Sequence, residues 1–468
     1  MGLDLYVFEI KEREMMWTLR RKGVFRRAAS AAALVVTAVG AAHAQVTFVQ
    51  IPTFDTNGSQ IVPMSINASG TVTGYYRDFQ YTTAGGATGY PTGWIGTASG
   101  SSSTLSLMYP AGHEGDASYL PGGSNYNGDL SWGLDMNSSG TVAGAVRDQV
   151  MQHTSAGTAT LGNLNGFTNT TYAAAFAAGI NDNGYFVGGS QAGSNNLHAI
   201  VSVPPAGQNT GTSGLVDISG GQISAAYAIS QDASTIVGFR STSASTGFNA
   251  ARTGKVATVW NYDSGSSSWL PTALGSLKSG GQSVAYGLNN SGLIVGVSDV
   301  ASGAPEAFVR LTNGTMIALP STAGAAGGGT TTTLPSPINF NWNTTTAAYD
   351  PLTYYGTSGV NSCADAINNN GQIVGFMWVG SSKHAFVATL DSNNVPTVVD
   401  LNSLLPSADQ GWTLSEATSI NDSGQIVGYG LLGGVETGFE LTLPSVPGPS
   451  SVALISCACV VATTRRRR

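Results

Sequence analysis

The stretch that decides the fold reads Ile420-Asn421-Asp422-Ser423-Gly424-Gln425-Ile426-Val427-Gly428. Asn421 to Gly424 has the composition of a tight hairpin turn, because glycine adopts positive φ without penalty and Asn or Asp tolerates it best. An Asn side chain also bonds the backbone two residues further on, which holds the turn before the strands pair. The Ile-Val pair suits a buried strand, and the closing Gly428 permits a bulge or a close backbone approach. The stretch therefore predicts two antiparallel strands joined by a short turn.

The chain repeats this phrase seven times. The copies begin at Ile66, Met136, Ile180, Ile229, Leu288, Ile367 and Ile420. The copy at Ile229 is one residue longer than the others and lacks the turn glycine. The shortest intervals between the turn positions are 44 residues (137 to 181), 49 (181 to 230) and 53 (368 to 421), close to the length of a four-stranded propeller blade. A unit of this size cannot bury both faces of its own sheet, so neighbouring units must stack.

Two weaker patterns complete each unit. One is a strand of the type His384-Ala385-Phe386-Val387, and the other is an apolar closing strand such as residues 399–404. With the two strands of the hairpin they make four strands, which is one propeller blade. The last unit lacks its fourth strand, and residues 46–51, ahead of the first phrase, are the natural donor. We therefore predict an all-β propeller of seven four-stranded blades closed by an N-terminal strand. Six blades, through a split or missing unit near 230, and a β-solenoid are the alternatives.

The composition supports many short strands and excludes one class of partner. Only 10% of the 468 residues are charged, whereas glycine reaches 62. Residues 45–446 carry 8 Lys and Arg against 22 Asp and Glu, a net charge near −14. An acidic surface is a poor partner for a phosphate backbone. We therefore expect no binding of nucleic acid.

The repeated phrase, followed by His384-Ala385-Phe386, resembles the HAF repeat family of bacterial extracellular proteins. The resemblance covers roughly residues 60–440. It implies an exported, β-rich repeat protein. It brings no established activity and no catalytic residues to carry over.

The N-terminal residues 1–44 have the features of a secretory signal peptide. A basic stretch precedes a short apolar run, and Ala42 and Ala44 fit the cleavage site. The first residues are acidic, which is unusual ahead of such a signal, so translation is expected to start at Met15 or Met16. The propeller is then expected to span residues 45–444.

Residues 445–468 resemble a PEP-CTERM sorting signal, the three-part tail of exported proteins of Gram-negative bacteria. Pro447 and Pro449 precede a short apolar run, and Gly448 stands where the family's motif has glutamate. The run ends in an arginine cluster of Arg465, Arg466, Arg467 and Arg468, as expected of a segment stopped at the inner membrane. The resemblance implies an exosortase-type processing enzyme as partner, transient anchoring in the inner membrane, and a final location at the cell envelope or outside the cell.

A long insertion before the sixth phrase carries the candidate ligand-binding residues. Aromatic side chains beside an amide can stack on a sugar ring and hydrogen-bond it, and loops on a rigid scaffold commonly carry function. The candidates are Asn341, Trp342, Tyr349, Tyr354 and Tyr355. The alternative is that these aromatics pack the insertion onto a blade.

Catalytic and metal-binding motifs are absent from the sequence. His113 lies beside two carboxylates without the spacing of a metal site, and His198 and His384 share one slot of the repeat, which indicates a structural role. The Asn-Asp turns carry too few carboxylates for a calcium loop, and we expect no metal or other cofactor. Cys363 lies ahead of the sixth phrase and is predicted to be buried.

The preferred function is a non-enzymatic scaffold or adhesion module of the cell surface or extracellular matrix, with exopolysaccharide as a candidate ligand. The alternative is a polysaccharide lyase or hydrolase with its site at the central mouth of the propeller. Carboxylates and His113 converging at one end of the channel would favour the enzyme. A mouth lined only by backbone, Asn and Thr would remove its reactants.

Overall fold

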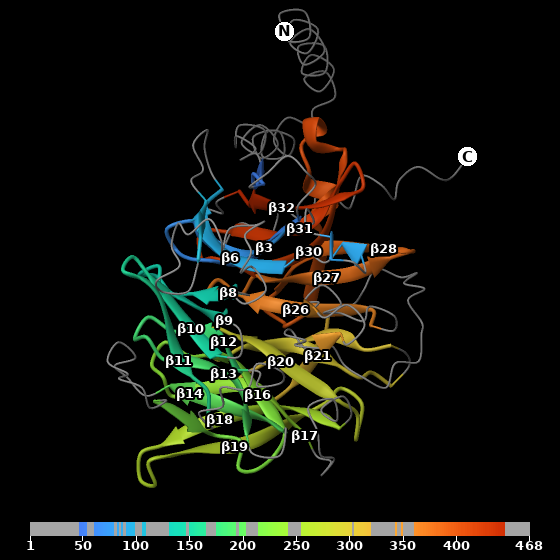
Figure 1. The fold of residues 1–468 in the computed structure, drawn as a ribbon. Coiled ribbons are helices and arrows are strands. Elements are labelled where there is room, and N and C mark those ends of the chain that lie inside the picture. Colours follow the sequence, from blue (N-terminus) through green and yellow to red (C-terminus); the bar gives the residue numbers. More distant parts are fainter. Residues whose placement is uncertain are drawn as a thin grey trace, which may run out of the picture. The chain divides into compact units, whose positions relative to one another are not determined.

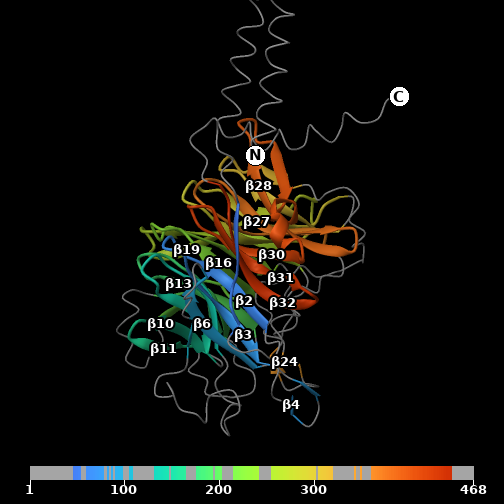
Figure 2. The same cartoon turned by 90° about the horizontal axis from the view of Figure 1, so that it is seen from above.

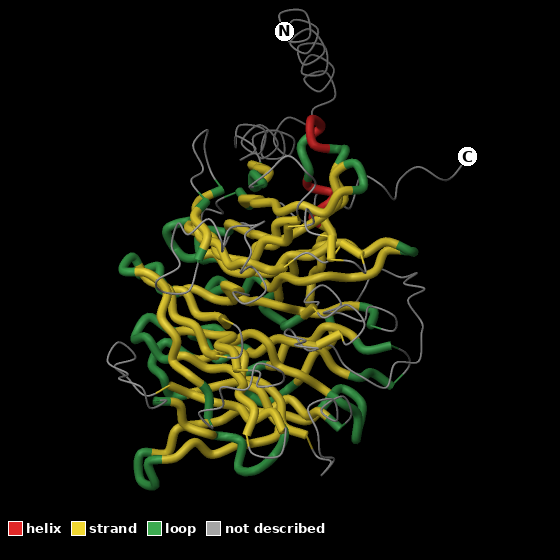
Figure 3. Tube along the Cα trace, viewed as in Figure 1, coloured by secondary structure: helices red, strands yellow, loops and turns green. Residues whose placement is uncertain are grey.

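The structure, a computed structural model, describes most of the repeat region. The described residues are 46–53, 60–78, 82–83, 86–87, 90–98, 105–108, 131–146, 149–164, 175–192, 196–202, 214–241, 254–301, 304–319, 342–343, 348–349 and 360–444. Almost all of them lie in β-strands or in the turns between strands (Figure 3).

Seven antiparallel sheets of four strands follow one another along the chain. In each blade the strands are given from the first strand to the fourth. The first three blades are β2 (Gln60–Ile66), β3 (Thr71–Asp78), β6 (Tyr90–Thr97) and β7 (Ser106–Leu107); β8 (Ser131–Met136), β9 (Val142–Val146), β10 (Gln149–Thr154) and β11 (Gly157–Gly162); and β12 (Ala175–Ile180), β13 (Phe186–Ala192), β14 (Asn196–Ser202) and β15 (Leu215–Asp217). The fourth and fifth blades are β16 (Ser224–Ile229), β17 (Thr235–Ser241), β18 (Lys255–Asp263) and β19 (Ser268–Gly275); and β20 (Ser283–Leu288), β21 (Ile294–Ser298), β22 (Glu306–Arg310) and β23 (Met316–Ala318). The sixth and seventh blades are β26 (Ser362–Ile367), β27 (Ile373–Val379), β28 (Ser382–Leu390) and β29 (Pro396–Asp400); and β30 (Trp412–Ile420), β31 (Gln425–Leu432), β32 (Val435–Thr442) and β1 (Thr47–Gln50).

The remaining described elements are short. They are the two-stranded pairs β4 (Thr82–Thr83) with β5 (Gly86–Ala87) and β24 (Trp342–Asn343) with β25 (Ala348–Tyr349), and the 3-10 helices η4 (Leu401–Leu404) and η5 (Ser407–Asp409).

The blades close into a ring. Each first strand contacts the first strands of the two neighbouring blades, including β30 with β2. The N-terminal strand β1 completes the last blade by pairing with β32, from Thr47 opposite Thr442 to Gln50 opposite Phe439. The blue and red parts of the described chain therefore lie side by side in both views (Figures 1 and 2). This confirms the seven-bladed propeller and its closure. The segment around 230 forms a complete blade, so the six-bladed alternative and the solenoid are wrong.

The closing glycine of each phrase brings the first two strands of a blade together. A Cβ on Gly375 would lie 2.0 Å from the backbone oxygen of Cys363. In each of the other six blades a Cβ on the equivalent glycine would lie 1.9–2.0 Å from the equivalent backbone oxygen of the first strand. Beyond this contact the register of every first strand shifts by one residue, which is a β-bulge. The sequence predicted a close backbone approach or a bulge at this glycine; the close approach is found there, and the bulge lies in the first strand opposite it.

The core is divided between the seams of adjacent blades and the centre of the ring. At the seam of the last two blades, Val374, Leu414 and Phe439 belong to one buried cluster. At the centre, side chains from several blades meet, among them Trp132 and Phe376. Fully burying a side chain of this size contributes about 1.5–3 kcal/mol, so the stacked sheets carry the stability of the fold.

Candidate functional site

The seven hairpin turns form a ring around one end of the central channel. In each of six turns the amide of the first Asn donates a hydrogen bond to a backbone oxygen in the next blade. These bonds run from Asn67 to Asn137 (3.3 Å), Asn137 to Asn181 (3.3 Å), Asn181 to Ser230 (3.0 Å), Asn289 to Asn368 (3.1 Å), Asn368 to Asn421 (2.9 Å) and Asn421 to Asn67 (2.9 Å). We call this set the asparagine ring. It joins the last blade to the first, and every blade except the fourth to the next.

Each Asn of the ring also holds its own turn. The Oδ1 atom of Asn421 accepts hydrogen bonds from the backbone N–H groups of Ser423 and Gln425, both at 3.0 Å. Gly424 then takes a φ of 78°, which favours glycine. The local role was predicted from the sequence, whereas the bond to the next blade was not.

The fourth blade breaks the ring. Ser230 occupies the position of the Asn, and its hydroxyl accepts from the N–H of Thr235 at 3.0 Å and donates to Asp232 within the same turn. Ala233 takes the left-handed conformation, with a φ of 55°, that glycine takes elsewhere. Ser230 has no amide to reach the next blade, so its link to Asn289 is missing.

Inside this ring lies a cavity of about 560 Å³, lined by residues from all seven blades. At each bulge the strand register passes over one residue of the first strand, and this residue lines the cavity. The type of this residue varies around the ring. The seven residues are Met64, Leu134, Ala178, Tyr227, Tyr286, Asp365 and Thr418. Tyr75, Trp132 and Tyr429 add aromatic surface. Small-molecule sites commonly have volumes of roughly 300–1,000 Å³, so this cavity is large enough for a ligand.

Carboxylates converge on this cavity, as the enzyme alternative requires. The acidic residues that line it are Asp135, Asp182, Asp365, Glu416 and Asp422. His113, which the enzyme alternative also requires at this end of the channel, lies outside the described residues. Asp182 and Asp422 belong to the turns, where their carboxylates accept from the backbone N–H groups of Ser138 and Asn369, both at 2.8 Å.

Asp135 ties three blades together. Its Oδ1 atom accepts from the Ser65 hydroxyl and from the N–H of Met136, both at 2.8 Å. Its Oδ2 atom accepts from the N–H of Ile180 at 2.9 Å. Burial raises the pKa of Asp135 to about 6, although these hydrogen bonds act in the opposite direction. The group is a structural clasp and also an acid that titrates near neutral pH.

Glu416 is neutralised by an ion pair. Its carboxylate accepts from the Lys383 ammonium and, at 2.6 Å, from the Tyr429 hydroxyl. The ammonium of Lys383 lies 4.2 Å from the centre of the Phe376 ring, a favourable cation–π contact. Burial, followed by the charge of Glu416, raises the pKa of Tyr429 well above its usual range. Tyr429 therefore stays a neutral hydrogen-bond donor on the cavity wall.

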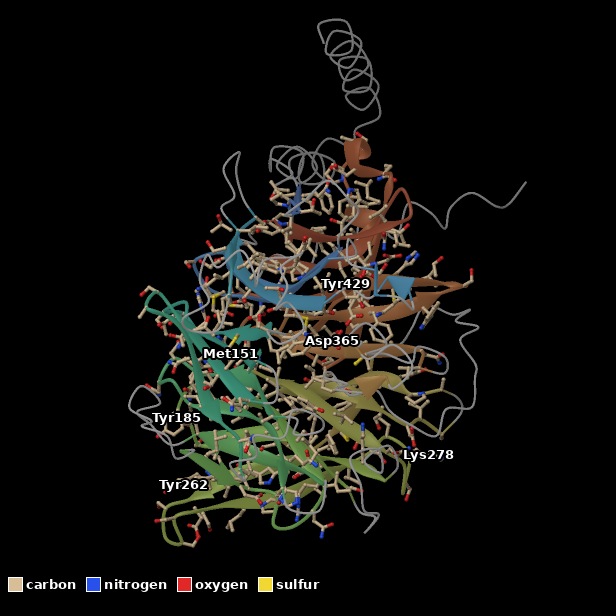
Figure 4. The ribbon with its side chains drawn as sticks, in the orientation of Figure 1. Met151, Tyr185, Tyr262, Lys278, Asp365 and Tyr429 are labelled. Carbon is tan, nitrogen blue, oxygen red and sulfur yellow. The ribbon has the colours of Figure 1, made fainter. Side chains whose placement is uncertain are left out.

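Asp365 is the bulge residue of the sixth blade. Its Oδ1 atom accepts a hydrogen bond from the Cys363 thiol at 3.2 Å. Burial, with the charge of Asp365, raises the pKa of Cys363 well above its usual range, so the thiol stays protonated and keeps donating. Cys363 is buried, as predicted. Asp365 and Tyr429 are both labelled in the central part of Figure 4.

His198 and His384 occupy equivalent positions on β14 and β28. The Nδ1 atom of each lies 2.7 Å from an aspartate on the neighbouring outer strand, Asp217 for the first and Asp400 for the second. Ser219 also contacts Nδ1 of His198, at 3.0 Å, so this Ser-His-Asp group lacks the arrangement of a catalytic triad, which uses both ring nitrogens. The two histidines thus share an aspartate partner as well as a slot, and their structural role stays a prediction.

The predicted ligand-binding residues lie in a region that the structure describes only in part. Trp342 of β24 pairs with Tyr349 of β25. Asn341, Tyr354 and Tyr355 lie outside the described residues, as do the predicted signal peptide and sorting tail.

In the described ranges, no three His, Cys, Asp or Glu side chains gather closely enough to hold a metal ion. No helix in the described part of the chain has the length and apolar character needed to cross a membrane.

The cavity carboxylates were missed in the sequence, although the repeats contain a signal for them. Glu416 lies five residues before the Asn of its phrase, where the other six copies have apolar or small residues: Val62, Trp132, Phe176, Ala225, Val284 and Cys363. Asp365 is likewise the only charged residue three positions before the turn, and Asp135 the only one two positions before it. Comparing the copies position by position would have revealed all three.

No family model matches the chain, and no curated protein sequence matches it. Several solved structures are similar in fold. The β-propeller domain of the Trilobed protease from Pyrococcus furiosus is 6% identical, with a TM-score of 0.41 over 83% of this chain and 94% of that one. Trypanosoma rangeli sialidase is 9% identical (TM-score 0.36, 89% of this chain and 61% of that one), and an ancestral GH74 enzyme is 11% identical (TM-score 0.33, 83% and 42%). The chain thus spans less than two thirds of the last two proteins. The similarity concerns the propeller architecture alone.

Proposed function

We propose that this protein is a non-enzymatic glycan-binding propeller, acting as a scaffold or adhesion module that holds one end of an exopolysaccharide in the cavity inside the asparagine ring. The observation that carries the proposal is the lining of the cavity. Tyr227 and Tyr286 stand on neighbouring blades with ring centres 5.4 Å apart, and Trp132 of the second blade also lines the cavity. Aromatic faces beside hydrogen-bonding groups suit a sugar ring, which is apolar on its faces and polar at its edge.

The state of the carboxylates supports binding rather than catalysis. Asp135 already accepts three hydrogen bonds within the fold, and Glu416 is engaged by Lys383 and Tyr429. Glycoside hydrolysis needs two carboxyl groups available on either side of the scissile bond. Groups held by the scaffold in this way are better suited to shaping and charging a binding site.

A glycan array with the purified protein tests this proposal, with Tyr286→Leu as the cavity variant and Tyr262→Leu as the matched control. Tyr262 lies on β18, the third strand of the fourth blade, is 47% exposed, and does not line the cavity (Figure 4). We expect saturable binding of a glycan to the wild type, a loss of at least tenfold in the cavity variant, and no change in the control. Binding that both variants retain would exclude the cavity as the site.

A polysaccharide hydrolase or lyase is the second candidate, and one observation favours it. Asp135 has a pKa of about 6, which suits a general acid, and it shares the cavity with Asp365 and Glu416. Incubating the wild type and Asp135→Asn with polysaccharides and measuring new reducing ends or unsaturated products decides between the two. Release that the variant abolishes would establish the enzyme, whereas binding without release supports the scaffold.

We further propose that the protein is exported and sorted to the envelope or outer surface of a Gram-negative cell, or secreted, with an exosortase-type enzyme acting on its tail. The support is the sequence of residues 1–44 and 445–468. Replacing Arg465, Arg466, Arg467 and Arg468 by alanine is expected to abolish processing at the tail, which cell fractionation and mass spectrometry would measure. An unchanged mature mass and location would contradict this proposal.

A further inference from the structure

Two kinds of hydrogen bond join the turns of adjacent blades. The first is the bond of the asparagine ring, in which an amide donates to a backbone oxygen of the next blade. In the second, the backbone N–H of the residue after the ring position donates to the side-chain oxygen of the equivalent residue in the next blade. This second bond runs from Ser138 to Asp182 (2.8 Å), Asp182 to Gln231 (2.9 Å), Asn290 to Asn369 (2.9 Å) and Asn369 to Asp422 (2.8 Å).

The seam between the fourth and fifth blades has neither bond. Ser230 has no amide, so among the described residues the backbone oxygen of Asn289 accepts only from the N–H of Gly292, at 3.0 Å. In the same part of the chain the backbone N–H of Gln231 has no acceptor. Each of the other six seams keeps at least the bond of the asparagine ring. We call this place, with the Gln231 N–H on one side and the Asn289 oxygen on the other, the open seam.

The open seam borders the cavity. Gln231 and Asn289 both line it. Tyr227 and Tyr286 lie three positions before Ser230 and Asn289 on the same two blades, and they also line the cavity, with ring centres 5.4 Å apart. An unused donor, an unused acceptor and an aromatic pair are therefore contributed by the same two blades.

A secondary amide supplies what the open seam lacks. It carries one N–H donor and one carbonyl acceptor, and in the planar trans form these point in opposite directions. An amide between the two blades therefore donates to the Asn289 oxygen on one side and accepts from the Gln231 N–H on the other. A hydroxyl has to make both bonds through a single oxygen atom, which suits two partners on opposite blades less well.

We infer that the open seam binds the acetamido group of an N-acetylated amino sugar, whose N–H donates to Asn289 and whose carbonyl accepts from Gln231. The sugar ring then packs against Tyr227 and Tyr286. Five acidic residues and no Lys, Arg or His are among the described residues that line the cavity, which disfavours an anionic sugar. This inference rests on the proposed glycan-binding function and names the class of sugar.

Isothermal titration of the full-length protein with three sugar trimers tests the inference. The trimers of N-acetylglucosamine, glucosamine and glucose share one linkage and differ only in an acetamido, ammonium or hydroxyl group on the same carbon. The variant Ser230→Asn offers the protein's own amide to the Asn289 oxygen and so competes with the ligand. Ser423→Asn makes the same substitution at an exposed turn position outside the cavity, where the sixth blade has Asn370, and is the matched control.

We expect the N-acetylglucosamine trimer to bind at least tenfold more tightly than the other two, because only its amide fills both positions. Ser230→Asn should remove this preference, whereas Ser423→Asn should keep it. Thermal denaturation of both variants checks that they are folded, and the comparison of the three trimers in the wild type does not depend on either variant.

Equal affinity for the acetylated trimer and the glucose trimer, lost in Tyr286→Leu, would overturn the amide site and leave the glycan function intact. Tighter binding of the glucosamine trimer would show that charge sets the selectivity, and a preference that Ser230→Asn retains would exclude the open seam as its source. Binding of none of the three would overturn the inference, and the glycan function would fall with it only if the glycan array also showed no binding.

Discussion

The asparagine ring and the cavity wall lie next to each other at the same end of the channel, yet they are built on opposite rules. In the ring one residue type recurs, so that six of the seven turns make the same bond to the next blade. In the wall the residue at the bulge is Met, Leu, Ala, Tyr, Tyr, Asp and Thr from the first blade to the last, and Asp135, Asp365 and Glu416 each stand where the other copies have no charged residue. Recurring positions therefore build the scaffold, whereas positions that break the repeat give the cavity its charged and aromatic side chains.

The largest effect expected from disturbing the scaffold is that of Gly375→Ala. The new Cβ would lie 2.0 Å from the Cys363 oxygen, and relief requires the two strands to separate. We expect a loss of about 4 kcal/mol in the free energy of unfolding, measured by denaturant titration. The matched control is Gly371→Ala, which has open space around its Cβ but a φ of 77°, so it should lose only about 1 kcal/mol. Equal losses would show that the close approach does not constrain the blade.

Asp135 belongs to both regions, because it lines the cavity wall and also joins blades. Its pKa is about 6 in the folded protein against an ordinary 3.8, so the folded state binds more protons between these values. The free energy of unfolding should therefore fall as the pH rises from about 4 to about 6, by about 3 kcal/mol in total. Denaturant titration of the wild type and of Asp135→Asn at several pH values in this range gives the free energy of unfolding of each. The difference between the two values isolates the contribution of Asp135. Parallel curves would show that the group does not titrate in this way.

Removing one link of the ring should have an intermediate effect. Asn181→Asp keeps the oxygen that accepts from Tyr185 but loses the amide that donates to Ser230. We expect a loss of about 2 kcal/mol in the free energy of unfolding, because the Ser230 carbonyl loses its hydrogen-bond donor and faces the new carboxylate instead. Asn183→Asp, whose amide makes an exposed bond to Gln231, should lose less than about 0.5 kcal/mol. Similar values for the two variants would refute the importance of the buried ring.

The smallest effect is a gain. Ser230→Asn supplies the amide that the fourth blade lacks, next to the turn of Asn289. We expect a gain of about 0.5–1 kcal/mol, since one hydrogen bond is added while the longer turn partly opposes it. The same denaturant titration measures it, and a loss would show that the turn at 230 cannot orient the amide.

The architecture was predictable because its information is repeated. The turn chemistry of Asn421 and Gly424, the interval between phrases and the spare strand at 46–51 together determined the number of blades and the closure. These are local properties that recur, so chance matches are unlikely to imitate them. The bond from each Asn to the next blade was missed because it joins residues 44 to 354 positions apart, which no local pattern specifies.

The site was less predictable for a physical reason. A single Asp365 in one strand has no period, and the sequence does not show that a bulge points it into a cavity shared with Trp132 and Tyr286. The aromatic-rich insertion around Trp342 and Tyr354 was predicted instead, because its composition is locally unusual.

The most direct test measures both stability and binding in one variant from each region. For Tyr286→Leu, on the cavity wall, we predict at least a tenfold loss of affinity for the glycan that the wild type binds. For Asn181→Asp, which does not line the cavity, we predict affinity within twofold of the wild type and a loss of about 2 kcal/mol in stability. Unchanged affinity in Tyr286→Leu, or an equal loss of affinity in both variants, would contradict the division between a repeated scaffold and a binding wall.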